Sequence, residues 1–363
     1  MQKEVLFINH CLTGGGSEKA MTLIANYFVK QGINTSMVLL NKQKRTYMVD
    51  ERIHIIECYC PIQGNKWIWH LKRIKTIRDV LKKSKAKIVI TFMWDINMNV
   101  ILANWGLKKK IIASERCDPR HETRKLIKFA MNFILPFADF SVFQTEQVRN
   151  YYPKRVQKKS CVIPNALADD LPPPNRSTIE KTIVAIGRMT EQKNFEMLIN
   201  VFSDFLRKFS EYYLIIYGDG PLRTKLQKQA QDLGIENKVF FPGYVSNINY
   251  RIKNASMYIN SSNYEGISNA MLEAMAMGVP SVCTDCPVGG ASMTISNEIN
   301  GLLVPVNNAN ALLDAMCKIA SSSKLSKKLS MASIQIRKTL NINAIGNDWL
   351  QIYKTMEEKN EYF

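Results

Sequence analysis

The stretch NYEGISNAMLEAMAMGVP, residues 263–280, places two glutamates eight residues apart. The first, Glu265, precedes a predicted helix, and the second, Glu273, lies within that helix among small apolar residues. An ordinary acid near the start of a helix explains Glu265, but a carboxylate inside an apolar helix needs hydrogen-bonding partners. Hydroxyl groups of a ligand could supply them. Two carboxylates at this spacing therefore indicate a ligand that has hydroxyl groups at both of its ends.

The helix that follows the first glutamate should run from about Ser268 to Met277. Gly266 allows the preceding turn, and Ser268 or Asn269 can cap the helix. The first N–H groups of a helix attract an anion, because no partner within the helix satisfies them. These N–H groups belong to Ile267, Ser268, Asn269 and Ala270. A phosphate site flanked by two carboxylates matches the layout of a nucleotide sugar, in which a diphosphate joins ribose to hexose.

Two cations, Arg188 and Lys193, stand five residues apart in IGRMTEQKN, directly after a predicted strand. Arginine offers a planar fork and lysine a compact charge, a combination that suits a diphosphate. Two exposed cations at the start of a helix are the alternative. A helix start disfavours positive charge unless an anion shares the site, so we expect the pair to bind the diphosphate.

A glycine-rich stretch, HCLTGGGSEKA, follows the first predicted strand and opens a helix. Gly14, Gly15 and Gly16 let the backbone approach a ligand, and Ser17 can cap a helix whose N-terminus favours an anion. The run is not the G-x-G-x-x-G of dinucleotide sites, and no acidic residue clearly serves a ribose. A tight strand–helix turn without a ligand explains the stretch about equally well.

All these segments lie at the ends of predicted β-strands. Continuous apolar runs alternate with helical patterns throughout the 363 residues, which indicates parallel sheets covered on both faces. The first half contains the runs EVLFINH, NTSMVLLN, HIIECY, AKIVITFM, KKIIASE, FSVFQT and KSCVIPN, and the second half contains TIVAIGR, YYLIIYGDG, KVFFPGY, ASMYINSS, VPSVCTD and GLLVPVNN. A Pro-rich, polar stretch near 166–177 separates the halves. The pattern predicts two doubly wound α/β domains that face each other across a ligand-binding cleft.

The positive charge is concentrated in the first half. Residues 1–165 hold 29 basic and 12 acidic side chains, and the remainder holds 20 and 19. Such a local surplus suits an anionic membrane surface, a polyphosphate lipid or a nucleic acid. No apolar run reaches the roughly 20 residues of a membrane-spanning helix, and the scattered cysteines favour a reducing cytoplasm over a disulfide framework. CTDC at 283–286 has the spacing of a metal site but lacks a second pair, so we interpret it as incidental.

Two basic segments of the first half also carry apolar residues. Residues 66–85, KWIWHLKRIKTIRDVLKKSK, alternate apolar and basic positions, and residues 120–137, RHETRKLIKFAMNFILPF, repeat that mixture. A helix that faces the core and has a charged outer face is the alternative for 66–85. We expect peripheral attachment to an anionic inner leaflet. A nucleic-acid-binding module is the competing class, but no nucleic-acid motif is present.

The stretch EGISNAMLEAMAMGVPSV resembles the E-x7-E signature of retaining glycosyltransferases with the GT-B fold, in the large family 4. GGGSEKA, IPNA, GRMTEQKN, GDGPLR, FPGYV and NGLLVPVNN occur in the order and approximate spacing of that family, so the resemblance covers essentially the whole chain. It implies two Rossmann-like domains that face each other across a cleft. Residues 1–166 would bind the acceptor, 167–344 would bind the nucleotide sugar, and a C-terminal helix in 345–363 would pack back on the first domain.

The resemblance also implies roles for residues of both domains. Glu265 would hold the donor sugar and support the developing oxocarbenium ion, while Arg188 and Lys193 would neutralise the departing diphosphate, so these three are the implied catalytic residues. The implied donor-binding residues are Glu273 at the ribose, Tyr244 and Val245 near the base, Gly15, Gly16, Gly218, Ile267, Ser268, Asn269 and Ala270.

One stretch departs from the family pattern. Many relatives carry a histidine near the reacting sugar, in a pattern like Ser-x-His, where this chain has ASERCDPR with Arg116. Members that build surface polysaccharides often show SER-x-DP, so the difference resembles a subfamily feature. Glu115, Arg116 and Asp118 are therefore candidates for the acceptor or sugar side. His10, at the end of the first predicted strand, is a further candidate, although a structural role suits it better.

The resemblance implies a retaining hexosyl- or N-acetylhexosaminyltransferase that needs no metal and no cofactor besides its UDP-sugar substrate. Its acceptor would be a polyprenyl-diphosphate-linked glycan in the assembly of bacterial capsule, exopolysaccharide or O-antigen, at the cytoplasmic face of the cell membrane. No further carboxylate stands out as a nucleophile, so front-face substitution is expected, with the leaving phosphate helping to deprotonate the acceptor. An epimerase or phosphorylase of the same fold is the alternative. A sensor without catalysis would not need both glutamates and both cations.

Overall fold

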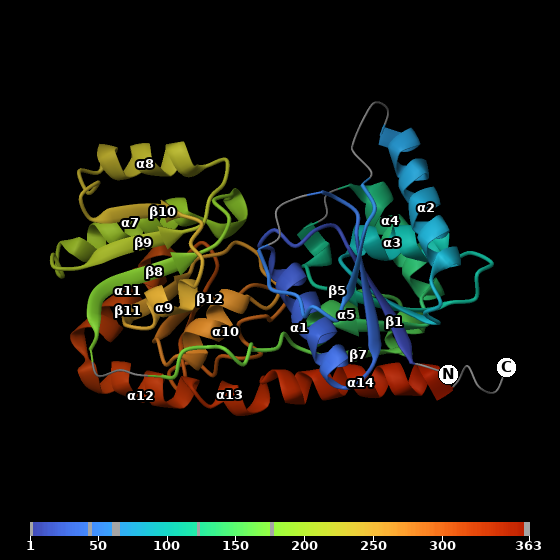
Figure 1. The fold of residues 1–363 in the computed structure, drawn as a ribbon. Coiled ribbons are helices and arrows are strands. Elements are labelled where there is room, and N and C mark those ends of the chain that lie inside the picture. The colour runs from blue at the N-terminus through green and yellow to red at the C-terminus, as the bar shows by residue number, and fades with distance from the viewer. Residues whose placement is uncertain (1–2, 43–45, 60–65, 122–123, 175–177, 359–363) are drawn as a thin grey trace. The chain divides into compact units, whose positions relative to one another are not determined.

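The chain folds into two compact units. Met1–Ala166 and Ile342–Phe363 make up the first unit, and Leu167–Asn341 makes up the second. In both units a parallel sheet carries helices on its two faces, which confirms the predicted pair of doubly wound α/β domains (Figure 1). The computed structural model describes residues 3–42, 46–59, 66–121, 124–174 and 178–358.

The sheet of the first unit has the strand order β3-β2-β1-β4-β5-β6-β7, and all neighbours are parallel. Its strands are β1 (Glu4–Asn9), β2 (Asn34–Leu39), β3 (His54–Glu57), β4 (Ile88–Phe92), β5 (Lys110–Glu115), β6 (Phe140–Phe143) and β7 (Ser160–Val162). Every residue of the apolar strand β4 is buried, because helices cover both faces of the sheet. The strand order reverses between β1 and β4. Sheets of this kind bind ligands outside the carboxyl ends of the strands at such a reversal.

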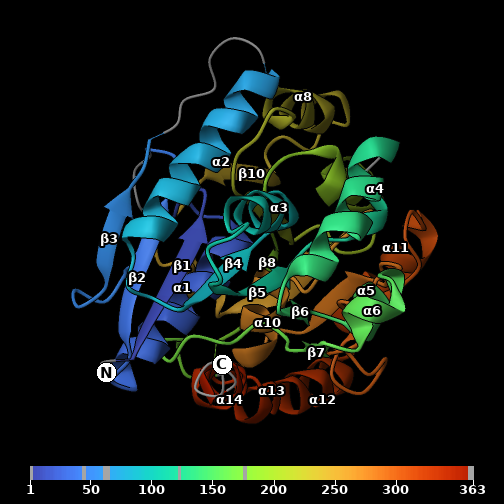
Figure 2. The same cartoon turned by 90° about the vertical axis from the view of Figure 1, so that its right-hand side faces the viewer.

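Helices cover the two faces of this sheet separately. Figure 2 shows α2, α3 and α4 on one side of the sheet and α14 on the other, where α1 packs against α14. The elements are α1 (Gly16–Lys30), α2 (Lys66–Lys83), α3 (Trp94–Ala103), η1 (Pro119–His121), α4 (Lys125–Ile134), η2 (Leu135–Phe137), α5 (Glu146–Tyr151), α6 (Lys154–Gln157) and α14 (Ile342–Glu358).

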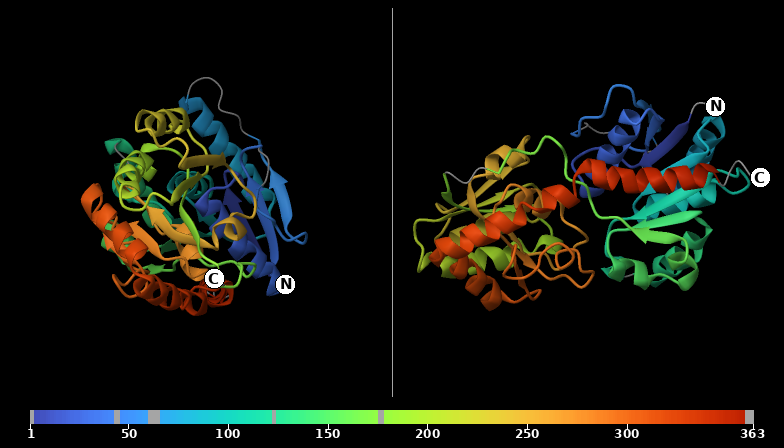
Figure 3. Two further views of the ribbon diagram at one scale, coloured as in Figure 1. Left: turned by 90° about the vertical axis from the view of Figure 1, so that its left-hand side faces the viewer. Right: turned by 90° about the horizontal axis from the view of Figure 1, so that it is seen from below.

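The C-terminal helix α14 is part of the core of the first unit, and Figure 3 shows it in red alongside that unit. Trp349 is fully buried and stacks on Phe92 of β4, with the ring centroids 5.4 Å apart. Tyr353 meets Phe28 of α1 edge-on at 5.5 Å. The helix begins at Ile342, so the second unit ends at residue 341 rather than at the predicted 344. Residues 359–363, which the sequence analysis included in the C-terminal helix segment, lie outside the described residues.

The second unit repeats the topology of the first. Its sheet has the order β10-β9-β8-β11-β12-β13, again with parallel neighbours, and the order reverses between β8 and β11. The strands are β8 (Glu180–Ile186), β9 (Tyr213–Tyr217), β10 (Val239–Gly243), β11 (Ala255–Asn260), β12 (Ser281–Thr284) and β13 (Leu302–Val304). The helices are η3 (Glu191–Lys193), α7 (Phe195–Leu206), α8 (Arg223–Asp232), α9 (Ile248–Ile252), α10 (Asn269–Ala276), α11 (Ala309–Ser321), α12 (Ser323–Ser333) and α13 (Ile336–Thr339).

Two apolar clusters hold the second unit together, one on each face of its sheet. On one face, Phe202 of α7 and Met316 of α11 are fully buried. On the other face, Met271 and Met275 of α10 pack with Tyr258 of β11. The small side chains of α10 allow this close approach to the sheet. Among the described helices, none combines the length and apolarity needed to cross a lipid bilayer.

Candidate active site

The second unit brings the predicted catalytic residues to the reversal of its strand order. Arg188 follows β8, Lys193 ends the short helix η3 that continues from it, and Glu265 follows β11. Strands β8 and β11 are direct neighbours. The loops that carry the cations and the loop that carries the glutamate therefore start from adjacent strands at the same edge of the sheet. This edge is where a doubly wound sheet binds its ligand.

Lys193 and Glu265 form an ion pair between the lysine Nζ and the glutamate Oε2. Their side chains are 14% and 19% exposed, so the pair is largely buried. The Ser262 hydroxyl donates a second hydrogen bond to the same Oε2, over 3.2 Å. The sequence argument required an anion beside the cations, and Glu265 of the protein itself is that anion in this structure. Arg188 is exposed, and its side chain makes no hydrogen bond or ion pair with another described residue.

Hydrogen bonds fix the glutamate loop to the lysine turn. The Ser261 hydroxyl donates to the backbone carbonyl of Lys193 over 2.8 Å, and the backbone N–H of Asn263 donates to the carbonyl of Gln192 over 2.8 Å. The Gln192 side chain donates to the carbonyl of Tyr264 over 3.1 Å. Sequence reasoning missed these positioning residues. The polar run NSSN after β11 was the available signal, because a strand that leads into a plain turn does not need four hydrogen-bonding side chains.

Two glycines make room for the lysine. A Cβ on Gly187, at the end of β8, would lie 2.6 Å from the Lys193 Cε, so the lysine side chain crosses over bare backbone there. Gly218 follows β9 with a φ of 119°, and a Cβ on it would lie 2.1 Å from the carbonyl oxygen of Gly187. Gly218 was predicted to bind the donor. The structure places Gly218 against the backbone of Gly187, and its role toward a donor stays a prediction.

The tip of α10 has the predicted form. Ser268 is the N-cap, and its hydroxyl accepts a hydrogen bond from the Met271 N–H over 3.4 Å. Ile267 and Ser268 are buried, whereas Asn269 and Ala270 are half-buried. Glu273 lies one turn into the helix and is only 6% exposed.

Tyr258 of β11 lies in the field of both signature glutamates. Burial raises the pKa of Tyr258 well above its usual value, and the charges of Glu265 and Glu273 add to that increase. Both glutamates of the E-x7-E stretch are therefore close enough to the Tyr258 hydroxyl to raise its pKa, so the two ends of the stretch lie in the same part of the unit.

The predicted base-binding residues lie further along the same sheet edge. Tyr244 follows β10 and is 59% exposed, while Val245 is half-buried against the α10 face of the sheet. Strand β10 is separated from β8 by β9. The cysteines of CTDC are both buried thiols, and burial raises the pKa of Cys286 to about 11. Within the described ranges, no group of three or more His, Cys, Asp or Glu side chains is arranged to hold a metal ion.

In the first unit a histidine–aspartate hydrogen bond spans the corresponding reversal of strand order. His10 follows β1, and its Nε2 lies 2.6 Å from Oδ2 of Asp95, the second residue of α3 after β4. The guanidinium of Arg73 meets the other ring nitrogen, Nδ1, at 2.6 Å. Because arginine can only donate, Nδ1 accepts and Nε2 carries the proton. Both ring nitrogens are thus engaged by the protein, so His10 positions α2 and α3 and has no free nitrogen for a substrate.

The glycine loop of the first unit differs from the prediction. The helix α1 begins at Gly16 with Gly15 as its N-cap, so Ser17 lies inside the helix and does not cap it. The Oε2 atom of Glu18 accepts hydrogen bonds from the N–H groups of Gly14 at 3.0 Å and Gly15 at 3.2 Å. A phosphate at Gly15 would therefore compete with the carboxylate of Glu18, in the first turn of α1. Gly16, the other predicted phosphate contact, is the first residue of the helix.

Arg116 is buried, and contacts within the protein hold its guanidinium in place. Its guanidinium donates to Ser114 Oγ over 2.8 Å and to Asn165 Oδ1 over 3.0 Å. It also lies over the rings of Phe92 and Trp349, at 5.0 and 5.5 Å. Burial lowers the pKa of Arg116 to about 9, although Glu115 opposes this change. The arginine thus ties β5, the loop after β7 and the helix α14 together.

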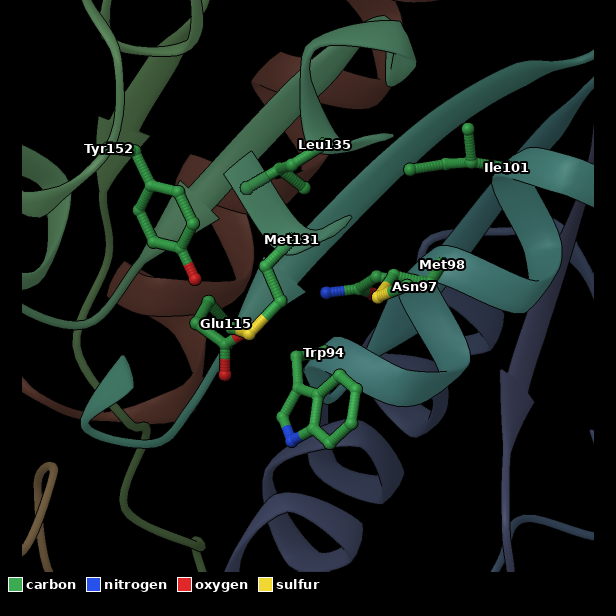
Figure 4. Close-up of a pocket in the computed structure, with 8 residues that line it drawn as sticks. All are labelled: Trp94, Asn97, Met98, Ile101, Glu115, Met131, Leu135 and Tyr152. Carbon is green, nitrogen blue, oxygen red and sulfur yellow. The ribbon is translucent and has the colours of Figure 1, made fainter. Parts of the chain in front are cut away.

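Asp118 and Glu115, the neighbours of this arginine, are both buried. Asp118 accepts a hydrogen bond from the backbone N–H of Arg120 over 2.9 Å and forms an ion pair with the guanidinium of Arg120. Asp118 therefore holds the start of η1. Glu115 ends β5, and burial raises its pKa to about 8. It lines a pocket together with Tyr152, a residue that no motif in the sequence singles out (Figure 4).

Comparisons with known proteins agree with this architecture. Residues 169–335 match the family model described as glycosyl transferases group 1. One relative, from Campylobacter jejuni, is the GalNAc-α-(1→4)-GalNAc-α-(1→3)-diNAcBac-PP-undecaprenol α-1,4-N-acetyl-D-galactosaminyltransferase. It is 25% identical to this chain, over 96% of this chain and 98% of that protein.

Solved structures show the same fold. A sucrose-phosphate synthase of Thermosynechococcus elongatus superposes with a TM-score of 0.84 at 17% identity, covering 98% of this chain and 100% of that one. The Anabaena protein HepE in complex with UDP superposes with a TM-score of 0.79 at 14% identity, over 97% and 100%. The match to the glycosyl transferases group 1 family therefore lies in the second unit, and the chain is a glycosyltransferase with the GT-B fold.

Proposed function

We propose that this glycosyltransferase moves a hexose or N-acetylhexosamine from a UDP-sugar to a polyprenyl-diphosphate-linked glycan, with retention of configuration and without a metal. The observation that carries the proposal is the buried Lys193–Glu265 pair at the strand reversal of the second unit. The tip of α10 and Glu273 lie beside it in the same unit. Two similarities support the proposed acceptor and donor. The Campylobacter relative is named for an undecaprenol-diphosphate-linked glycan, and the Anabaena protein HepE was solved in complex with UDP.

The pair explains how bond cleavage would be assisted. When the bond between the sugar and the diphosphate breaks, negative charge grows on the leaving oxygen and positive charge grows on the sugar ring. Lys193 and the exposed Arg188 would stabilise the first charge, and Glu265 would stabilise the second. Both side chains of the pair are already held in place, so little reorganisation is needed at the moment of reaction. The leaving phosphate would then accept the proton of the acceptor hydroxyl on the same face of the sugar.

A donor screen followed by a transfer assay tests this proposal. We expect one UDP-sugar to raise the melting temperature of the protein and to be transferred to a short polyprenyl-diphosphate-linked glycan. The product should keep the anomeric configuration of the donor, as measured by NMR, and EDTA should leave the rate unchanged. Inverted configuration or loss of activity with EDTA would contradict the mechanism. Conversion of the donor without a glycan acceptor would favour an epimerase, and a requirement for free phosphate would favour a phosphorylase.

We also propose that the first unit attaches to the anionic cytoplasmic face of the cell membrane. An aromatic patch supports this: the rings of Phe129 and Phe133 of α4, Phe137 of η2 and Trp105 form a chain of contacts about 6 Å apart, and each side chain is at least 52% exposed. The neighbouring basic side chains are Arg124, Lys125, Lys128 and Arg155. Exposed rings with basic neighbours suit the boundary between lipid headgroups and acyl chains.

Of the two basic segments, residues 66–85 give weaker support for membrane attachment than residues 120–137. Ile77 and Leu81 of α2 are fully buried and Arg73 is 2% exposed, so this part of the helix faces the core, as the alternative reading held. Only Ile68 and Leu71 of its described apolar side chains are largely exposed. The side chain of Trp67 lies outside the described residues.

Replacing Phe129 and Phe133 by serine together should reduce binding to anionic vesicles by at least tenfold. Burial of a phenylalanine side chain contributes about 1.5–3 kcal/mol, so loss of two rings exceeds one factor of ten. Flotation with anionic and with neutral vesicles measures the effect. A matched double variant in the second unit, Phe240→Ser with Tyr250→Ser, removes two exposed rings and should bind like the wild type. Equal recovery of the wild type with neutral and anionic vesicles would contradict the attachment.

A further inference from the structure

The hydroxyl group of Ser262 lies between two acceptors beside the Lys193–Glu265 pair. Ser262 follows the end of β11 by two residues, and its side chain is completely buried. Its Oγ lies 2.6 Å from Oδ1 of Asn260 and 3.2 Å from Oε2 of Glu265, the oxygen that Lys193 also contacts. A serine hydroxyl has one proton, so it can donate to only one of the two oxygens at a time.

The backbone of Ser262 is held on both sides. Its N–H donates to Asn260 Oδ1 over 3.3 Å, and its carbonyl accepts from the Thr284 hydroxyl over 2.7 Å and from the Cys286 thiol over 3.3 Å. Two residues of the CTDC stretch thus support this serine. Because the backbone is fixed, the hydroxyl can turn from one acceptor to the other by rotation about a single bond, without movement of the loop.

The charge of Lys193 decides which acceptor is the better one. While Lys193 is paired with Glu265, its positive charge weakens that carboxylate as an acceptor, and the Asn260 oxygen is also the nearer of the two. A carboxylate without its cation is a stronger acceptor than a carboxamide, because hydrogen bonds to ionised groups are about twice as strong as neutral ones. Withdrawal of Lys193 therefore favours donation from Ser262 to Glu265.

A nucleotide diphosphate would withdraw Lys193 in this way. It carries more negative charge than one carboxylate, so it attracts the lysine Nζ more strongly than Glu265 does. Glu265 is only 19% exposed, and a largely buried carboxylate that loses its cation is destabilised. Within the described ranges, Lys193 and Ser262 are the side chains that donate to this carboxylate. Ser262 is therefore placed to compensate the loss.

We propose that Ser262 is a positioning residue that takes over Glu265 when Lys193 turns to the diphosphate of the donor. The hydroxyl rotates from Asn260 to Glu265, holds the carboxylate in place beside the sugar, and lowers the free-energy cost of separating the ion pair. The donor can then use the full charge of Lys193 without displacing Glu265. This inference rests on the proposed function, because it assumes a nucleotide diphosphate at Lys193.

Binding of UDP to the full-length protein, measured by titration calorimetry, tests the inference without a sugar or an acceptor. Ser262→Ala should raise the Kd of UDP about tenfold, because a hydrogen bond to a charged group no longer compensates the separation of Lys193 from Glu265. In Glu265→Gln the lysine has no carboxylate to leave, so UDP should bind more tightly than to the wild type. Adding Ser262→Ala to Glu265→Gln should then change the Kd by less than about twofold.

A matched control and the possible outcomes separate this role from a general effect on the fold. Ser281→Ala removes an equally buried hydroxyl, which donates to the Val279 carbonyl over 3.0 Å, and should leave the Kd of UDP unchanged. A serine that only braces its loop would weaken UDP binding by the same factor with and without the Glu265 carboxylate. That result, or an unchanged Kd in Ser262→Ala, would overturn the inference and leave the transferase function intact. A wild type that does not bind UDP would overturn the proposed donor class, and this inference with it.

Discussion

Replacing Lys193 by alanine should lower kcat by about 100- to 1,000-fold, with a smaller effect on donor affinity. Removal of one donor that stabilises developing negative charge typically raises the barrier by about 3–4 kcal/mol. Lys193 is the largely buried cation at the strand reversal, with 14% of its side chain exposed, so solvent replaces it poorly at the leaving group. Steady-state kinetics with the UDP-sugar identified by the donor screen measures kcat and KM separately. Near-normal turnover with normal donor affinity would show that the leaving-group assignment is wrong.

The ion pair with Glu265 requires a further control, because the loss of Lys193 also leaves that carboxylate without its cation. The double variant Lys193→Ala with Glu265→Gln separates the two effects. If Lys193 acts only by neutralising Glu265, the double variant should be no slower than Glu265→Gln alone, whereas a lysine that acts on the leaving group makes the double variant slower than Glu265→Gln. Lys225→Ala is the matched surface control. Its exposed side chain pairs with Glu196 in the same unit, at 2.8 Å, and its loss should leave kcat unchanged.

The fold could be predicted from the sequence because its signals are local. Each predicted apolar run overlaps one of the observed strands, from EVLFINH at β1 to GLLVPVNN at β13. Parallel strands buried on both faces give continuous Val and Ile runs, which a single sequence displays directly. The cap at Ser268 was predictable for the same reason, since an N-cap serine and its helix are adjacent in the chain. The start of α1 was less predictable, because glycine as the N-cap leaves Glu18 to occupy the first amides.

The partners of the site residues could not be predicted, because they come from distant parts of the chain. Lys193 and Glu265 are 72 residues apart, and only the neighbouring positions of β8 and β11 bring them together. Arg116 meets Asn165 across 49 residues and Trp349 across more than half of the chain. The sequence shows a charged residue in a motif, but not whether that charge faces a ligand or a carbonyl. The roles of Lys193, Glu265 and the α10 tip toward a donor stay predictions.

Replacing Trp349 by alanine should lower the free energy of unfolding of the first unit by about 3–5 kcal/mol, the usual effect of deleting a buried tryptophan. The ring is fully buried, stacks on Phe92 and lies beneath the Arg116 guanidinium. Its removal therefore leaves a cavity between α14 and β4 and takes one aromatic face from a buried charge. All five tryptophans belong to the first unit, so urea denaturation followed by tryptophan fluorescence reports on that unit alone.

Two controls show whether the effect arises from the attachment of α14. Trp105→Ala removes a ring that is 70% exposed and should change the unfolding free energy by less than about 0.5 kcal/mol. Trp349→Phe keeps an aromatic ring over Phe92 and should recover most of the loss, because the buried indole N–H makes no hydrogen bond in the described structure. If Trp349→Ala and Trp105→Ala shift the urea midpoint equally, α14 does not contribute to the core. The first unit would then owe its stability to residues 1–166 alone, and the return of the chain at Ile342 would need another explanation.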